Sequence, residues 1–296
     1  QHPPELFAGS HRGCCSGPSN CRNGPEVQRM KIGIAGMGAI GLRVAQELDQ
    51  GGIPGCTLAG FSARNADRAA EANAQLSTPV PCFELAEIAD HCDLVIETLP
   101  PSLFNDLAIP VLTAGKTLMV LSASQLLGRQ DLLDLAEKTG AKIVIPSGAM
   151  LGLDAIKGVA VGEINSVVIE TRKPVAGLIK APYVAKMDVD LTKITEPYLI
   201  MEGSVTEVAQ AFPANVNVAA AVSLAGLGPD KTRMEVWADP ALERNKHTVR
   251  VTSDSSDFTM SIQNRPSVEN PATGKITALS VIALLRQKTA VLQVGT

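Results

Sequence analysis

Three glycines near the first predicted strand have the spacing of a phosphate-binding turn. The segment Gly36-Met37-Gly38-Ala39-Ile40-Gly41 follows a short apolar run and opens a stretch with helical periodicity. In that context the first glycine permits a tight turn, the second lets the backbone approach a pyrophosphate, and the third lets helix and strand pack closely. The first N–H groups of the helix then face the phosphates. We therefore predict that residues 36–41 bind a dinucleotide.

The residues after the second predicted strand bear on which dinucleotide binds. A carboxylate about 20 residues after the turn would bind the ribose 2′-hydroxyl of NAD. Residues 61–65 contain no carboxylate, and Arg64 could instead meet a 2′-phosphate. The alternative is that Arg64 is a solvated residue at the start of a helix. The expected cofactor is NAD or NADP, with NADP accepted.

One histidine lies where it could exchange protons with a substrate. In a strand predicted at residues 247–252, His247 shares a face with Val249 and Val251, so its ring is expected to point inward. A buried polar ring needs hydrogen-bond partners. An imidazole with an ordinary pKa of about 6.5 suits proton transfer to or from water. His247 is thus the catalytic candidate, against the alternative of a structural histidine.

Two cations and one amide are candidates for contacts with ligands. Arg172 and Lys173 follow a strand predicted at residues 167–171 and could bind a carboxylate, although alternation should turn only one of them into a cleft. Surface charge at a strand end is the alternative. Asn217 lies in the first turn of a predicted helix, where its amide could match a carboxamide or a ribose hydroxyl. Alternatively, Asn215 caps that helix and Asn217 only assists.

The elements around these residues divide the chain into parts. Residues 30–146 alternate short apolar runs with helical segments, which predicts a Rossmann-type, doubly wound parallel sheet as the dinucleotide-binding domain. Residues 147–265 carry more strands than helices, which predicts a second α+β domain on a mixed sheet for substrate and catalysis. Residues 266–296 should supply a helix that returns to the first domain. Residues 1–29 are expected to be a disordered extension.

Composition excludes several classes of protein. The chain has 26 basic and 30 acidic residues, a net charge of −4, and only 3% aromatic residues, so no nucleic-acid partner is expected. The uncharged stretch at residues 211–229 is interrupted by prolines and asparagines, so no membrane span is expected. Six cysteines without ligand spacing predict neither a metal site nor a disulfide scaffold, and favour a cytoplasmic protein.

Several longer motifs resemble one known family. They are Thr171-Arg172-Lys173-Pro174, Pro146-Ser147-Gly148-Ala149-Met150-Leu151-Gly152-Leu153-Asp154-Ala155, Phe212-Pro213-Ala214-Asn215-Val216-Asn217-Val218-Ala219-Ala220, Arg244-Asn245-Lys246-His247-Thr248-Val249 and Glu269-Asn270-Pro271. With the glycine turn, they resemble the L-aspartate dehydrogenase family from about residue 30 to the end of the chain. One departure is Met150-Leu151, where relatives usually carry Ile-Gly.

The resemblance implies an activity and site roles. It implies NAD(P)-dependent oxidative deamination of L-aspartate through iminoaspartate to oxaloacetate and ammonia, with possible reductive amination in reverse and possible supply of iminoaspartate to NAD biosynthesis. By motif, His247 matches the family's catalytic histidine, while Ala149 and Asn217 match its cofactor contacts. Analogy with related second sheets suggests a homodimer.

Two other functions remain open from the residues alone. The first is an NAD(P)-dependent reductase of another amino-acid pathway intermediate, although such reductases usually carry a His-His pair that this chain lacks. The second is a non-enzymatic dinucleotide sensor, which would need the glycine turn but not His247.

Overall fold

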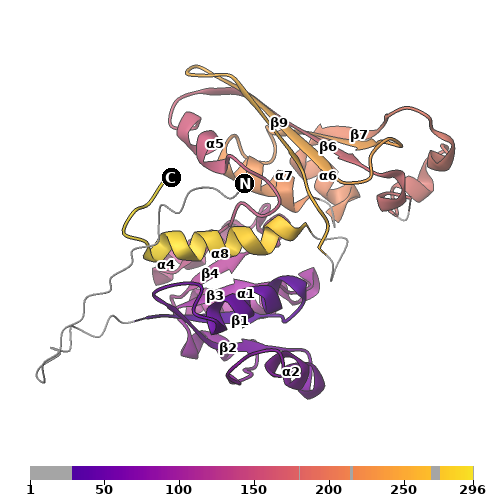
Figure 1. The fold of residues 1–296 in the computed structure, drawn as a ribbon. Coiled ribbons are helices and arrows are strands. Elements are labelled where there is room, and N and C mark those ends of the chain that lie inside the picture. Colours follow the sequence, from indigo (N-terminus) through magenta and orange to yellow (C-terminus); the bar gives the residue numbers. More distant parts are fainter. Residues whose placement is uncertain (1–28, 180, 214–215, 268–273, 296) are drawn as a thin grey trace, which may run out of the picture.

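Two five-stranded sheets organise the chain (Figure 1). The computed structural model describes residues 29–179, 181–213, 216–267 and 274–295, so the expected extension lies outside the described residues except for Arg29. None of the helices described is long and apolar enough to cross a membrane.

The first sheet is parallel throughout, which confirms the predicted doubly wound arrangement. Its strand order is β2-β1-β3-β4-β5. The strands are β1 (Met30–Ala35), β2 (Cys56–Ser62), β3 (Leu94–Glu97), β4 (Thr117–Val120) and β5 (Lys142–Val144). The connecting helices are α1 (Ala39–Asp49), α2 (Ala66–Asn73), α3 (Phe104–Thr113) and α4 (Gln130–Thr139).

Alternating residues of these strands fill two cores. Ile32 and Ile34 of β1 pack in one core with α1, whereas Val95 of β3 and Leu118 of β4 pack in the other with α3 and α4. Gly140 ends α4 in the left-handed region, which glycine adopts readily. The helix α2 is short: Asn65 caps its start through the Arg68 N–H, and Asn73 at its end bonds the backbone of Val80.

The second sheet is mixed, as predicted, in the order β10-β9-β6-β8-β7. Only β6 and β8 pair in parallel. Its strands are β6 (Ile164–Lys173), β7 (Tyr198–Ser204), β8 (Arg233–Ala238), β9 (Lys246–Ser253) and β10 (Phe258–Gln263). The helices α5 (Leu153–Val159), α6 (Val205–Ala211) and α7 (Asn217–Ala225) contribute to its core, and α6 begins with a capping box formed by Ser204 and Glu207.

The last helix, α8 (Lys275–Thr289), leaves the second sheet and packs on the first. Val281, Ile282 and Leu285 are buried in the same core as α1. Arg286 adds an ion pair with Glu47 of α1. The helix therefore ties the end of the chain to the dinucleotide-type sheet.

Candidate active site

A cavity of about 380 Å³ lies where the carboxyl end of the first sheet meets strand ends of the second sheet. From the first half it is lined by the start of α1 and by the loops after β3, β4 and β5. From the second half it is lined by strand ends of β6 and β9 and by the start of α7, and Asn264, Gly274 and Thr277 also contribute. Ligands of open α/β sheets bind at this carboxyl edge.

The glycine turn has the conformation that the motif requires. Gly36 has φ +97°, and a Cβ there would lie 2.7 Å from the Thr98 carbonyl oxygen. A Cβ on Gly41 would overlap the Gly36 carbonyl oxygen, so this position also needs glycine. A Cβ on Gly38 would meet no protein atom within 4 Å and would project into open space. Since no side chain caps α1, its first N–H groups are available to a phosphate.

Strand alternation decides which side chains of the second sheet reach the cavity. Thr171 of β6 stands opposite His247 of β9, and Thr171 Oγ1 lies 3.1 Å from His247 Nδ1. Lys173 lies two residues further along the same face, and both Lys173 and His247 line the cavity. His247 is therefore positioned by a specific hydrogen bond at the end of the site nearest the second sheet.

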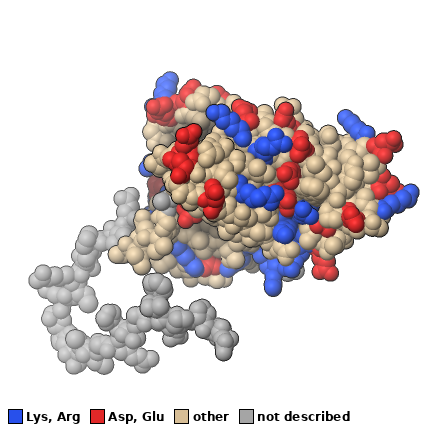
Figure 2. All heavy atoms as spheres, turned by 90° about the horizontal axis from the view of Figure 1, so that it is seen from above, with Lys and Arg blue, Asp and Glu red and all other residues tan. Residues whose placement is uncertain are grey.

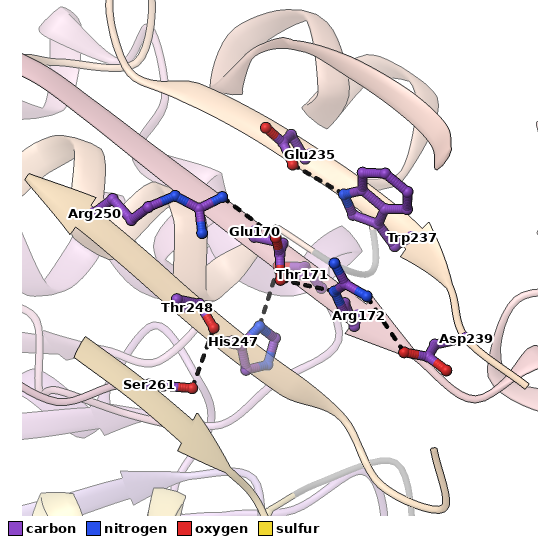
Figure 3. Close-up of polar contacts among 10 residues, drawn as sticks. All are labelled: Glu170, Thr171, Arg172, Glu235, Trp237, Asp239, His247, Thr248, Arg250 and Ser261. Carbon is purple, nitrogen blue, oxygen red and sulfur yellow. Dashed lines mark hydrogen bonds and ion pairs between the residues drawn. The ribbon is translucent and has the colours of Figure 1, made fainter. Parts of the chain in front are cut away.

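Arg172 points to the opposite face of the sheet, as alternation requires. Its guanidinium bonds Glu170 at 2.7 Å, lies 3.5 Å from Asp239 and stacks over Trp237 (Figure 3). Arg250 bonds the second oxygen of Glu170 at 3.3 Å. Of the two cations predicted to bind a carboxylate, the structure brings only Lys173 to the cavity.

Burial shifts the pKa of Lys173 and of His247, the two titratable groups among the described residues that line the cavity. Loss of solvent, with a smaller contribution from the charge of Lys173, lowers the pKa of His247 to about 4. Burial likewise lowers the pKa of Lys173 to about 8. At neutral pH the imidazole is thus neutral. The assumption of an ordinary histidine pKa, made from the sequence, does not hold in this fold.

Side chains from distant segments hold the cofactor candidates in place. Asn217 begins α7, and its Oδ1 accepts bonds from the N–H and hydroxyl of Ser124. The carbonyl of Ala149 accepts a bond of 2.9 Å from Asn264 Nδ2. The N–H of neighbouring Gly148 donates to Ser280 of α8. Ala149 and Asn217 both line the cavity. Their contact with a cofactor stays a prediction.

A buried carboxylate organises the loops of the first half. Glu97 is fully buried at the end of β3 and accepts bonds from the N–H groups of Leu99, Leu121 and Ser122 and from the Ser122 hydroxyl. Burial raises the pKa of Glu97, and these donors partly oppose that shift. The four bonds join the loops after β3 and β4, which both line the cavity.

Two other predicted residues lie away from this cavity. Met37 packs partly buried beside the core of α1. Arg64 is exposed in the turn between β2 and α2. That turn follows the strand next to β1, so Arg64 lies at the same edge of the sheet as the glycine turn.

Sequence reasoning missed several residues that line the cavity. Thr98 and Ser122 follow β3 and β4, and the rule that ligands bind at the carboxyl edge of the sheet could have found them. Asn245 lies two residues before His247, directly ahead of β9, and this spacing could have placed it on the same side as His247. Asn264 faces Asn245 only because of the β9–β10 pairing, which alternation alone does not reveal.

Comparison with known proteins identifies the family. A protein of Bordetella bronchiseptica named L-aspartate dehydrogenase 3 is 45% identical over 269 residues, which cover 91% of this chain and 98% of that protein. An L-aspartate dehydrogenase of Methanosarcina acetivorans is 37% identical and is matched over its full length, with 90% of this chain covered. The chain belongs to the L-aspartate dehydrogenase family.

Family models match both halves of the chain, and a solved structure shares its fold. Residues 154–288 match the model of the aspartate dehydrogenase C-terminal domain, and residues 36–146 match the NAD-binding domain of homoserine dehydrogenase. A crystal structure of aspartate dehydrogenase from Thermotoga maritima shares the fold, with a TM-score of 0.70 and 24% identity over 90% of this chain and all of that one. An NAD-binding domain takes a nicotinamide dinucleotide as cofactor. The open space beside Gly38 is compatible with a bound dinucleotide.

Proposed function

We propose that this protein catalyses the NAD(P)-dependent oxidative deamination of L-aspartate through iminoaspartate to oxaloacetate and ammonia. One observation carries the proposal: the glycine turn of the first sheet and His247 and Lys173 of the second line a single cavity. A dinucleotide sensor would not need the second group of residues. Membership of the family supports aspartate as the substrate.

The residues of the chain divide the work between the two halves. The glycine turn and the uncapped start of α1 would hold the pyrophosphate, while Ala149 and Asn217 would hold the nicotinamide half. When bound, the dinucleotide would supply the acceptor for the hydride that leaves C2 of the amino acid. Lys173 supplies the positive charge that attracts a dicarboxylate. The neutral ring of His247 can accept a hydrogen bond from the water that hydrolyses the imine.

His247→Ala tests the proposal together with a substrate survey. Wild-type protein is assayed with L-aspartate and other amino acids, using NAD and NADP, and products are measured as oxaloacetate and ammonia. We expect aspartate to be the preferred substrate. His247→Ala should lower the turnover number by about 10²- to 10⁴-fold and bind the dinucleotide normally. A wild-type protein inactive on aspartate would overturn the proposed function. Unchanged turnover in the variant would remove His247 from the reaction.

We also propose that NADP is accepted, because Arg64 follows β2 where NAD-specific sites carry a carboxylate. An arginine there can pair with a 2′-phosphate. Arg64→Ala should then raise the KM for NADP about tenfold, the effect of losing about 1.4 kcal/mol, and leave the KM for NAD unchanged. Strict NAD use, unaffected by the substitution, would contradict this assignment.

The open face of the second sheet supports a homodimer. This face points away from the first sheet, and acidic and basic side chains are interspersed on the surface seen in Figure 2. Half-buried Trp237 lies on it among charges that pair within the chain. A second copy could pack there without burying unpaired charge. Light scattering during gel filtration should give twice the monomer mass. A cytoplasmic location and the supply of iminoaspartate to NAD biosynthesis remain predictions.

A further inference from the structure

We propose that Lys173 is the general base that removes a proton from the α-ammonium group of the substrate before C2 is oxidised. This inference rests on the proposed function and deepens it, because it gives Lys173 a catalytic task as well as its charge. A protonated amine has no lone pair to form the C=N bond. Oxidation at C2 therefore needs a group in the cavity that accepts this proton.

Geometry places Lys173 and His247 together at the cavity wall. Both face it from adjacent strands, because Thr171, two residues before Lys173, pairs with His247. The Lys173 residue is only 8% exposed, so its Nζ meets ligands in the cavity rather than bulk water. The same cavity reaches Gly38 and the start of α1. A substrate next to the dinucleotide would thus lie within the region that Lys173 faces.

The described residues around Lys173 include one other titratable group of the cavity wall and one carboxylate outside it. Among the described residues that line the cavity, Lys173 and His247 are the titratable ones. Asp239 follows β8 beside Lys173, but its carboxylate faces Arg172 and accepts a bond from the Ala241 N–H. Asn245, which directly precedes β9, is uncharged. From α7, the lining residues Asn217, Val218 and Ala221 are uncharged as well.

The pKa values of the two residues favour Lys173 over His247 as the proton acceptor in this step. Burial lowers the pKa of Lys173 to about 8, so a neutral amine is available in mildly alkaline solution. With a pKa of about 4, His247 is a poor acceptor for a proton from an aliphatic ammonium. In the step itself, an N–H bond of the substrate breaks and an N–H bond to Nζ forms, with no change of oxidation state. Lys173 then carries the positive charge beside the substrate carboxylates.

Three substitutions at Lys173 separate a base from a simple cation. Lys173→Met removes both properties, and Lys173→Arg keeps the charge but cannot accept a proton at working pH. Lys173→Ala leaves room for methylamine as an added base. The matched control is Lys246→Met, which changes a lysine of β9 on the opposite face, across from Arg172. Steady-state kinetics with L-aspartate are measured across pH, and binding of reduced dinucleotide is followed by fluorescence.

We expect kcat/KM of the wild type to rise with pH through a pKa of about 8. Lys173→Arg should keep the KM for aspartate within about threefold of the wild-type value but lower kcat by about 10²- to 10⁴-fold. The pH dependence with a pKa of about 8 should disappear in this variant. Methylamine should restore part of the turnover of Lys173→Ala in proportion to its concentration. Dinucleotide binding should be unchanged in every variant, and Lys246→Met should behave as the wild type.

The outcomes distinguish this inference from the proposed function. A wild type without aspartate turnover would overturn the proposed function, and the role of Lys173 with it. An active wild type with Lys173→Arg within tenfold of its kcat would overturn only the role of Lys173 as a base. A raised KM for aspartate at normal kcat would assign Lys173 to substrate binding alone and would equally overturn the inference.

Discussion

Asn217 at the start of α7 joins the two halves of the chain through Ser124. Its Oδ1 accepts bonds from Ser124 N at 3.2 Å and from Ser124 Oγ at 2.7 Å. Because a backbone N–H can only donate, the amide oxygen faces Ser124, and the amide NH2 group remains to donate to a ligand. The same side chain thus links the halves and faces the cavity.

Asn217→Asp separates these two tasks. An aspartate keeps the oxygen that accepts both bonds from Ser124 but removes the NH2 group. We therefore expect the KM for the dinucleotide to rise about tenfold, as one lost hydrogen bond of about 1.4 kcal/mol would produce. Thermal unfolding should change little. Ser124→Ala is the control, because it keeps the NH2 group and should leave this KM within about threefold. An unchanged KM in Asn217→Asp would show that the NH2 group does not contact the dinucleotide.

Gly38→Ala should damage binding without damaging the fold. The new methyl group would meet no protein atom within 4 Å, but it would occupy the approach of a phosphate. We expect at least about tenfold weaker dinucleotide binding, the effect of about 1.4 kcal/mol, with the melting temperature unchanged. The comparison is Gly41→Ala, which forces a contact with the Gly36 carbonyl and should cost about 1–3 kcal/mol of stability. Normal binding by Gly38→Ala would place the phosphates elsewhere.

Burial of His247 should make the protein acid-sensitive over a defined range. Its pKa falls from 6.5 to about 4 on folding, so between these values the unfolded chain binds more protons than the folded chain. The free energy of unfolding should therefore decrease by about 3 kcal/mol as the pH falls from about 6.5 to about 4. Above that range the residue contributes no pH dependence. Urea unfolding at several pH values measures this, and His247→Gln should have a shallower slope. Identical slopes would mean that His247 titrates normally in the folded protein.

Glu97→Gln tests the carboxylate that joins the loops after β3 and β4. An amide NH2 group would replace one accepting oxygen and face N–H donors, so at least one buried donor would lose its partner. We expect a loss of about 1–3 kcal/mol in the free energy of unfolding, measured in urea. Dinucleotide binding should weaken as well, because both loops line the cavity. The exposed Glu137→Gln on α4 serves as the control. A stability equal to that of the control would show that the buried bonds contribute little.

Local patterns explain most of what the sequence could predict. The strand–turn–helix around Gly36 follows from glycine spacing and short-range periodicity, and the mixed second sheet follows from its succession of strands. Alternation alone required Arg172 and Lys173 to point to opposite faces. The capping box of α6 and the left-handed Gly140 depend only on residues three or four positions away. These features are set by neighbours in the chain.

Other features depend on which distant segments come together. Only the pairing of β6 with β9 decides that Lys173, rather than Arg172, shares a face with His247. The bond between Asn217 and Ser124 spans 93 residues, and that between Asn264 and Ala149 spans 115. The lowered pKa of His247 likewise requires a completed core to exclude water. Register, long-range contacts and burial are properties of the folded chain, so only the tertiary structure could decide them.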